Sequence, residues 1–323
     1  MHAIQLQSFG KPADVVKLVD VPDVGAPGPD EVVIAVEASP INGTDHLIIA
    51  GRYGYLPPLP SILGVEGVGR VAAIGRDVKH LKEGDRTLTP LMHPAWAERV
   101  KTGASWLRPL PNADVQQLSM LGINPATAYL LLTDIVPLKG GDWVIQNGAN
   151  SAVGRAVIAI AKTLGIKTVN VVRREELVDE IKSLGGDVVL VEGPELPKLV
   201  AAATGKAPIS LAIDMVADTA TMNLMNSIAP DGTVILYSVS SQKPLVGSGI
   251  QLIFNNQSIR GFWLINWFKT ATPDKLAAMY DHLASMVASG AISAPIAASY
   301  RFEKFPDALA LAAKRGGKVI LTP

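Results

Sequence analysis

Apolar residues in the first third of the chain are spaced in short, alternating runs. Segments in which roughly every second residue is apolar are predicted to form β-strands at residues 3–7, 15–20, 31–38 and 69–74. Turns rich in glycine and proline separate these segments, as at residues 25–29. This pattern is typical of a compact, irregular β-barrel.

The spacing of apolar residues changes near Asp142. The apolar run at residues 143–146 is followed by a loop of small residues, and residues 155–164 then carry apolar side chains at helical spacing. Gly165 ends this helix, and residues 168–172 form a second strand rich in β-branched side chains. A strand–loop–helix–strand unit of roughly 30 residues has the size of a nucleotide-binding half-fold.

Strands and helices continue to alternate after this unit. The predicted helices lie at residues 177–184, 195–204 and 220–228, and the predicted strands at residues 187–190, 211–214, 232–237 and 258–263. Such alternation predicts a parallel sheet that is covered by helices on both faces. The tail adds an amphipathic helix at residues 274–289 and a terminal strand at residues 318–321.

The loop between the first strand and helix of the unit could hold a diphosphate. The sequence there contains Gly154, but the first two glycines of a G-x-G-x-x-G fingerprint are replaced by Ala149 and Ser151. All of these side chains are small, so the backbone N–H groups and the positive end of the following helix remain accessible to an anion. The glycine pattern alone is weak evidence, and the surrounding unit strengthens it.

Two arginines follow the second strand of the unit. A fold that holds an unphosphorylated ribose places Asp or Glu about 20 residues past the loop, whereas this chain has Arg173 and Arg174. A guanidinium can bind a 2′-phosphate through two parallel hydrogen bonds, so the pair predicts NADPH as the cofactor. The alternative is a solvated basic turn in front of an acidic helix.

Composition excludes several classes of function. The chain has 323 residues, of which 48% are hydrophobic and 18% are charged, and its 29 basic residues balance 29 acidic ones. No basic excess suggests nucleic acid as a partner, and no apolar run reaches the roughly 18 residues of a membrane span. Cysteine is absent, which excludes disulfides and thiolate catalysis. The chain starts directly with a strand-like segment, so we expect a cytoplasmic protein, although a processed precursor would look the same.

A loop in the barrel region presents two tyrosines between glycines. Tyr53 and Tyr55 lie in the segment Gly51-Arg52-Tyr53-Gly54-Tyr55, and the proline-rich residues 56–60 stiffen the chain that follows. Side chains in such a loop can face a cleft, or they can simply cap the barrel. Composition alone leaves both interpretations open.

The whole chain resembles the medium-chain dehydrogenase/reductase superfamily, and within it the mitochondrial-type trans-2-enoyl thioester reductases. The segments that carry the resemblance are 41–45 (INGTD), 51–54 (GRYG), 122–129 (GINPATAY), 144–147 (VIQN), 170–173 (NVVR), 252–254 (LIF) and 260–264 (RGFWL). It implies an α/β fold with a GroES-like β-barrel catalytic domain at residues 1–121 and 269–323. A Rossmann domain with a doubly wound parallel sheet is expected at residues 122–268.

The resemblance also implies an activity and a set of site residues. The activity is NADPH-dependent reduction of the C2=C3 double bond of enoyl-CoA or enoyl-ACP, with hydride added to Cβ and a proton delivered to Cα by Tyr53. A phenol with a pKa near 10 stays protonated at neutral pH, which suits a proton donor. The residues expected to bind the cofactor are Asn124, Asn150, Ser151, Ala152, Val153, Arg173, Arg174, Tyr237, Ser238, Val239, Ser240, Phe262, Trp263, Leu264 and Lys318.

The zinc ligands of related alcohol dehydrogenases have no counterparts in this sequence. Val65 stands where the Gly-His-Glu-Gly motif of those enzymes has its histidine, and Asn42 and Gly43 stand at another pair of ligand positions. No two of the five histidines are spaced as paired ligands. We therefore expect no metal at the site. Asn42-Gly43-Thr44 also replaces a more usual Asn-Pro-Ser, which predicts a looser backbone before the helix that follows.

Two other functions remain possible at this stage. A zinc-free quinone reductase of the same superfamily would share the fold and NADPH but would not need a tyrosine proton donor. A non-enzymatic NADPH-binding or lens-type structural protein would keep the cofactor loop without using Tyr53. In either enzyme we expect a homodimer, because the apolar strand at residues 258–263 would invite aggregation if it formed a bare sheet edge.

Overall fold

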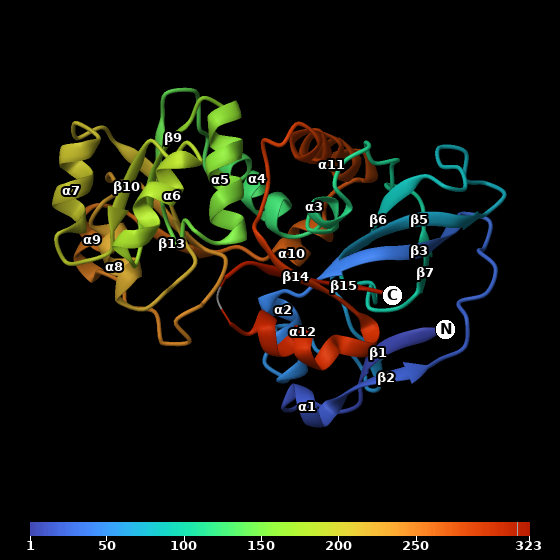
Figure 1. The fold of residues 1–323 in the computed structure, drawn as a ribbon. Helices are drawn as coiled ribbons and strands as arrows, with labels where there is room; N and C mark the ends of the chain where they lie inside the picture. The colour runs from blue at the N-terminus through green and yellow to red at the C-terminus, as the bar shows by residue number, and fades with distance from the viewer. Residues whose placement is uncertain (315) are drawn as a thin grey trace. The chain divides into compact units, whose positions relative to one another are not determined.

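The chain divides into two compact units. The computed structural model describes residues 1–314 and 316–323. Unit 1 comprises Met1–Ile123 and Phe268–Pro323, and unit 2 comprises Asn124–Trp267 (Figure 1). The expected α/β fold, with a β-barrel and a parallel sheet, is confirmed. The described residues include no helix that is both long and apolar enough to cross a membrane.

Unit 2 is built on one six-stranded sheet in which all neighbouring strands run parallel. In order across the sheet the strands are β10 (Val188–Val191), β9 (Lys167–Val172), β8 (Trp143–Asn147), β11 (Ile209–Asp214), β12 (Thr233–Leu236) and β13 (Ser258–Gly261). The strand order reverses between β8 and β11. In open parallel sheets this switch point, at the carboxyl ends of the strands, is where ligands bind.

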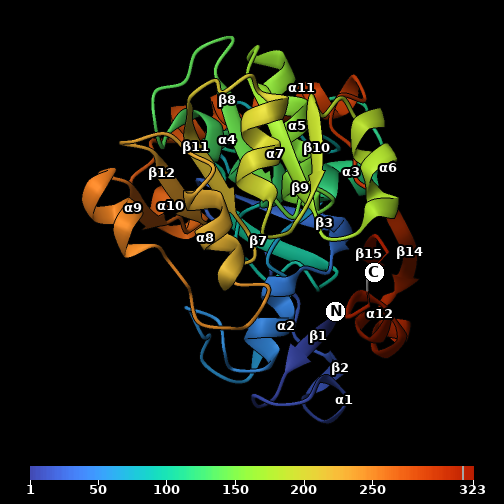
Figure 2. The same ribbon diagram turned by 90° about the vertical axis from the view of Figure 1, so that its left-hand side faces the viewer.

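Helices cover both faces of this sheet (Figure 2). On one face α7 (Leu196–Ala203) and α8 (Thr219–Met225) bury their apolar side chains, and on the other α5 (Ala152–Thr163) and α6 (Val178–Ser183) do so. The β-branched residues of β9 serve both faces, because Val171 points to the first and Val172 to the second. The remaining elements of unit 2 are α4 (Asn124–Thr133), which packs on α5, the 3₁₀ turn η1 (Glu175–Leu177), α9 (Gly249–Phe254) and α10 (Leu264–Phe268), whose last residue belongs to unit 1.

Helix α5 begins three residues earlier than the apolar spacing predicts, at Ala152 instead of residue 155. The cause is Ser151, whose hydroxyl accepts a hydrogen bond from the Gly154 N–H at 3.0 Å and caps the first turn. Asn124 is the first residue of α4.

Unit 1 is a barrel of mainly antiparallel strands to which the end of the chain contributes the parallel pair β14 and β15. One sheet has the order β2 (Val16–Asp20), β1 (His2–Leu6), β4 (Ser61–Ile62). The other has the order β14 (Ile296–Arg301), β15 (Lys318–Thr322), β3 (Glu31–Pro40), β5 (Gly67–Ile74), β6 (Arg86–Thr89), with β7 (Arg99–Gly103) also paired to β3. The helical elements are α1 (Pro12–Val15), α2 (Gly43–Ile49), α3 (Val115–Ser119), α11 (Pro273–Ala288), η2 (Phe302–Lys304) and α12 (Phe305–Ala312).

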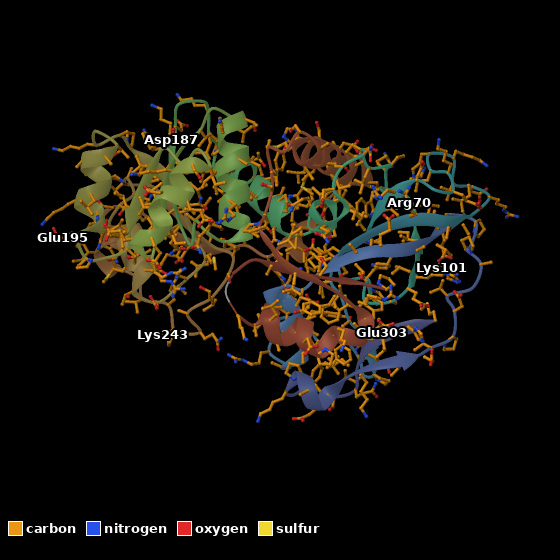
Figure 3. The ribbon with its side chains drawn as sticks, viewed as in Figure 1. Arg70, Lys101, Asp187, Glu195, Lys243 and Glu303 are labelled. Carbon is orange, nitrogen blue, oxygen red and sulfur yellow. The ribbon has the colours of Figure 1, made fainter. Side chains whose placement is uncertain are left out.

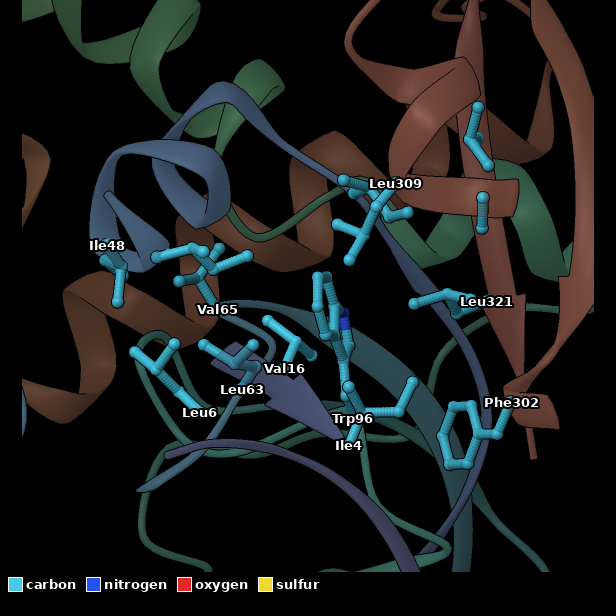
Figure 4. Close-up of a cluster of buried hydrophobic side chains, with 14 of the residues drawn as sticks. Ile4, Leu6, Val16, Ile48, Leu63, Val65, Trp96, Phe302, Leu309 and Leu321 are labelled. Atoms are coloured by element: carbon cyan, nitrogen blue, oxygen red, sulfur yellow. The ribbon is translucent and has the colours of Figure 1, made fainter. Parts of the chain in front are cut away.

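The core of unit 1 joins residues from both ends of the chain. Trp96 is fully buried and lies among Ile4, Phe302 and Leu321 (Figure 4). The chain passes so close to this ring that a Cβ at Gly64 would lie 2.4 Å from the Trp96 Cδ1 atom, and only glycine fits there. Because β15 pairs with β3, the tail of the chain is part of the barrel.

Candidate active site

The loop after β8 has the shape of a phosphate cradle. Gly148 adopts φ +59°, and a Cβ at Gly154 would lie 2.7 Å from the Ala149 Cα atom. The loop therefore packs directly against the first turn of α5, at the one position where the fingerprint glycine is retained. Ala149 and Ser151 are small enough for the other two positions. The free N–H groups at the start of this twelve-residue helix can hold an anion.

A cavity of about 640 Å³ opens beside this loop, at the carboxyl ends of β8, β9 and β11. Two cationic side chains line it: Arg173, which follows β9, and Lys243, on the loop between β12 and α9. Lys243 is labelled in Figure 3. Glu192 and Asp218 line it as well, so cations and carboxylates share its wall. A dinucleotide needs both kinds of group, because carboxylates accept hydrogen bonds from ribose hydroxyls and cations bind phosphate.

A buried carboxylate shapes one wall of this cavity. The Asp214 Oδ1 atom accepts hydrogen bonds from the Asn147 side-chain amide at 2.7 Å and from the Val216 N–H at 2.8 Å. The Asn147 Oδ1 atom in turn accepts from the Met215 N–H at 2.7 Å. These bonds hold the loop after β11, in which Ala217 and Asp218 adopt positive φ angles. The wall is thus pre-formed by unit 2 itself.

The two arginines predicted to bind a 2′-phosphate have different surroundings. Arg173 lines the cavity, whereas Arg174 is absent from its lining and forms an ion pair with Glu176 at 2.9 Å. Lys243, which sequence reasoning missed, supplies the second cation of the cavity. Its only sequence signal was its place three residues after Ser240, which also lines the cavity.

The other predicted cofactor residues are spread over both units. Tyr237 is half-buried, and burial raises its pKa above the ordinary value while a hydrogen bond to Ser151 opposes the shift. Lys318 lies in unit 1, where its Nζ donates to the Asn42 Oδ1 atom. Of the fourteen predicted residues that lie in unit 2, only Arg173 and Ser240 line the 640 Å³ cavity. The other twelve, all within the described ranges, are absent from its lining: Asn124, Asn150, Ser151, Ala152, Val153, Arg174, Tyr237, Ser238, Val239, Phe262, Trp263 and Leu264.

Tyr53 is held at the edge of the unit 1 core. It follows α2 and the turn at Gly51, which adopts φ +69°. A Cβ atom at Gly51 would lie only 3.0 Å from the Phe9 Cβ atom, so the turn is tightly packed. The Tyr53 ring is half-buried and packs against the apolar cluster that contains Ile48. Tyr55 is more exposed, at 49%. The two tyrosines therefore have different environments although they are two residues apart.

A buried polar network fixes the start of α2. The Glu66 carboxylate accepts from the Asn42 side-chain amide and from the Ile123 N–H, both at 2.8 Å. The Asn42 N–H donates to the Asp45 carboxylate at 2.8 Å, and Lys318 bonds the Asn42 Oδ1 atom. We expected a loose backbone at Asn42-Gly43-Thr44. That expectation was wrong, because three side chains hold Asn42 in place.

This network should make stability depend on pH. Burial raises the pKa of Glu66 from its ordinary value of 4.5 to about 7, and burial also raises the pKa of Asp45 from 3.8 to about 7. Between about pH 4 and 7 the folded state then binds more protons than the unfolded state, so stability falls as pH rises through this window. Glu66→Gln, which mimics the protonated form, should flatten the fall in Tm measured from pH 5 to 8.

Glu37→Gln is the control for this measurement. The hydrogen bonds and charges of Arg86 and Arg70 outweigh burial and lower the pKa of Glu37, so its contribution to stability is lost only as pH falls below about 4.5. The slope of Tm against pH above pH 5 should therefore be unchanged. An unchanged slope in Glu66→Gln as well would show that Glu66 does not titrate in this window.

The described residues hold no group of three His, Asp or Glu side chains arranged to bind a metal ion. Glu66, the one carboxylate of the Gly64-Val65-Glu66-Gly67 run, makes hydrogen bonds to Asn42 and Ile123. The valine at position 65 is buried in the apolar cluster of unit 1.

Comparison with known proteins relates both units to dehydrogenases. Residues 28–134 match the alcohol dehydrogenase GroES-like domain, and residues 152–285 match the zinc-binding dehydrogenase domain. The human protein named mitochondrial enoyl-[acyl-carrier-protein] reductase is 36% identical over 337 aligned positions, which cover 100% of this chain and 88% of that protein.

Two solved structures show the same fold over the full chain. A protein from Bacillus thuringiensis, provisionally named an NADPH:quinone reductase, superposes with a TM-score of 0.91 at 27% identity, covering 100% of this chain and 98% of its own. The heterodimer of mitochondrial 2-enoyl thioester reductase from Candida tropicalis has a TM-score of 0.87 at 25% identity, with coverage of 100% and 99%.

Proposed function

Because the chain belongs to the medium-chain dehydrogenase/reductase superfamily, and within it to the family of the mitochondrial enoyl-[acyl-carrier-protein] reductases, we propose that it reduces the C2=C3 double bond of trans-2-enoyl thioesters with NADPH. The protein is an oxidoreductase. The observation that carries the proposal is the similarity over the whole chain, 36% to the human protein. Tyr53 also supports the proposal, because its ring packs against the apolar core of unit 1 and is therefore held in place.

The cavity of unit 2 fits a dinucleotide. Gly154 lets the loop and helix α5 close around a diphosphate, and Ser151 orients the first turn by accepting the Gly154 N–H. Arg173 and Lys243 would hold the 2′-phosphate, since they are the two cations of the lining. When bound, the nicotinamide supplies the hydride that adds to Cβ of the substrate.

In this proposal Tyr53 supplies the proton, and neighbouring residues of unit 1 hold the tyrosine in position. Addition of hydride at Cβ places negative charge on the thioester carbonyl as an enolate, and Cα must then be protonated. The Tyr53 hydroxyl is protonated at neutral pH and is proposed to give its proton to Cα. Packing of the ring against the apolar cluster fixes its direction, and the network around Asn42 and Glu66 anchors the helix that precedes it.

A second candidate function is quinone reduction, which is favoured by the similarity to the protein from Bacillus thuringiensis. Oxidation of NADPH should be followed with crotonyl-CoA, with a quinone and without an acceptor. We expect rapid turnover with crotonyl-CoA and little with the others. A faster reaction with the quinone would favour the second function, and turnover with neither acceptor would contradict both.

We also propose that the protein is a homodimer. Strand β13 is an edge of the unit 2 sheet, and next to it α9 leaves Ile250 66%, Ile253 73% and Phe254 79% exposed. Large apolar side chains exposed to this degree on one short helix indicate a protein interface, and a second copy of this chain, related by a two-fold axis, can bury them.

Light scattering at micromolar concentrations should therefore give the mass of a dimer. The double variant Ile253→Glu with Phe254→Glu should give a monomer, because two carboxylates would have to be buried in the interface. Leu199→Glu, which also replaces an exposed apolar side chain by a carboxylate, at a residue 46% exposed on α7, should remain a dimer. A monomeric wild type would rule out the assembly.

A further inference from the structure

Glu192 is a carboxylate in the wall of the unit 2 cavity that can serve neither phosphate of the cofactor, because like charges repel. It follows β10, whereas Arg173 follows the neighbouring strand β9. The two strands run parallel with Val191 opposite Val172, and the Glu192 N–H donates to the Val172 carbonyl at 2.8 Å. Glu192 and Arg173 are therefore adjacent across the end of the sheet.

The order of the strands places Glu192 beyond Arg173. Strands β8, β9 and β10 are successive neighbours in the sheet. The loop after β8 is the proposed site of the diphosphate, and Arg173 after β9 is proposed to bind the 2′-phosphate of the adenosine ribose. The base is attached to that ribose. The end of β10 is therefore the next position along the sheet that the base can reach.

Helix α8 holds the Glu192 side chain in one orientation. The side-chain amide of Asn223, 31 residues further along the chain, donates to the Glu192 Oε1 atom at 2.6 Å. Asn223 also lines the cavity, so this hydrogen bond lies in its wall. A carboxylate can accept about four hydrogen bonds, so Glu192 keeps the capacity to accept one from a bound molecule.

The surroundings of Glu192 favour a ligand that donates a hydrogen bond. Burial raises the pKa of Glu192 above its ordinary value of 4.5, although hydrogen bonds from Asn223 and Gly193 oppose the shift. The negative charges of Asp214 and Asp218 raise the pKa further. The ionised carboxylate is thus incompletely stabilised within unit 2, and an N–H group of a ligand would stabilise it.

The rest of the wall offers apolar surface to the flat faces of a base. Six apolar residues line the cavity, namely Val171, Val172, Pro194, Val216, Ala220 and Met222. Pockets of this kind bury the body of a ligand against apolar side chains and fix its orientation with a few polar groups. An ionised carboxylate only accepts hydrogen bonds, so the edge that it binds must carry an N–H donor. Adenine carries such a donor in the amino group on C6.

Given the proposed use of NADPH, on which this inference rests, we propose that Glu192 recognises the adenine base of the cofactor by accepting a hydrogen bond from its C6 amino group. Asn223 is a positioning residue, because it acts through Glu192. The contact would make the protein select adenine over a base with a carbonyl oxygen on C6, because a carboxylate and a carbonyl oxygen repel each other.

The test compares NADPH with reduced nicotinamide hypoxanthine dinucleotide phosphate, in which an oxygen replaces the amino group. Fluorescence titration of the free protein gives the dissociation constant of each, and kcat/KM is measured with crotonyl-CoA. Both measurements are made at pH 8, which favours the ionised form of Glu192. The wild type should bind NADPH about ten- to a hundred-fold more tightly, the contribution of a hydrogen bond to a charged group. Equal dissociation constants would overturn the proposal.

Glu192→Gln should bring the two dissociation constants together. The glutamine amide can donate to the C6 oxygen of hypoxanthine and can also accept from the amino group of adenine. Its length is unchanged and its oxygen can still accept from Asn223, so the fold should be retained. A loss of affinity that is equal for both cofactors would mean that Glu192 acts on the ribose or on Arg173, and it would contradict the proposal.

Glu195→Gln is the matched control, since it makes the same chemical change three residues further on. Glu195 is exposed, is absent from the lining of the cavity and forms an ion pair with Lys198 at 2.7 Å (Figure 3). Its variant should keep the wild-type ratio of the two dissociation constants. An equal change of the ratio in both variants would show an effect of overall charge, and the contact with adenine would be wrong.

The contact with adenine and the proposed reaction can fail separately. If crotonyl-CoA is reduced equally well with both cofactors, and both bind equally, only the contact is wrong. If the wild type prefers NADPH in the titration and Glu192→Gln removes the preference, the contact stands even if no enoyl thioester is reduced. In that case the proposed function itself fails.

Discussion

Tyr53→Phe should slow the reduction of crotonyl-CoA by roughly 10²–10⁴-fold, the contribution of a well-positioned general acid. The ring packs against the apolar cluster of unit 1 and is retained in phenylalanine, so the fold and the affinity for NADPH should stay close to those of the wild type. The measurements are single-turnover rates with crotonyl-CoA and a thermal unfolding curve for each protein.

Two comparisons show whether the loss comes from the hydroxyl of Tyr53. Tyr55→Phe makes the same chemical change two residues further on and should reduce turnover far less. Any quinone reduction should barely respond to Tyr53→Phe, because the oxygens of a quinone can take protons from water. If Tyr53→Phe keeps near-normal turnover with crotonyl-CoA, the proton comes from another group and the assignment of Tyr53 is wrong.

Arg173→Asp should erode or reverse a preference for NADPH over NADH. Arg173 lines the unit 2 cavity, and a charge-assisted contact of this kind is worth roughly 1.5–3 kcal/mol, or about one to two decades in affinity. The new carboxylate would also repel a 2′-phosphate and could accept hydrogen bonds from the ribose of NADH. The measurement is kcat/KM with each cofactor at a fixed concentration of crotonyl-CoA.

Arg174→Asp is the matched comparison, since the same charge reversal is made one residue away. Arg174 pairs with Glu176 outside the cavity lining, so the change in cofactor preference should be clearly smaller. Equal effects of the two variants would indicate a general electrostatic field instead of a specific contact. A wild type that uses NADH and NADPH equally well would show that the cations of the cavity do not recognise a 2′-phosphate.

The sequence by itself determined the elements of this protein and the kind of site that they carry. The runs at residues 143–146 and 168–172 became β8 and β9, because strands buried on both faces are rich in apolar and β-branched residues. The small residues Ala149, Ser151 and Gly154 indicated a phosphate-binding loop, because a loop that packs closely against a helix needs small side chains, and these can be recognised in the sequence. Family resemblance then supplied the reaction and selected Tyr53 over Tyr55.

Element boundaries were less well determined where a single side chain decides them. The Ser151 cap starts α5 at Ala152, before the apolar spacing shows a helix. At Asn42 the sequence suggested a loose backbone, since it showed glycine where proline is usual. The partners that hold Asn42, Glu66 and Lys318, are 24 and 276 residues away along the chain.

Only the tertiary structure decided which side chains share a cavity. Arg173 and Arg174 are equivalent as sequence, but in the folded protein Arg173 lines the cavity and Arg174 forms an ion pair with Glu176. Lys243 joins Arg173 because the loops that follow β9 and β12 meet beside the unit 2 sheet, although they are far apart in the chain. Local periodicity extends over a few residues, whereas the wall of the cavity comes from contacts that close only when the unit has folded.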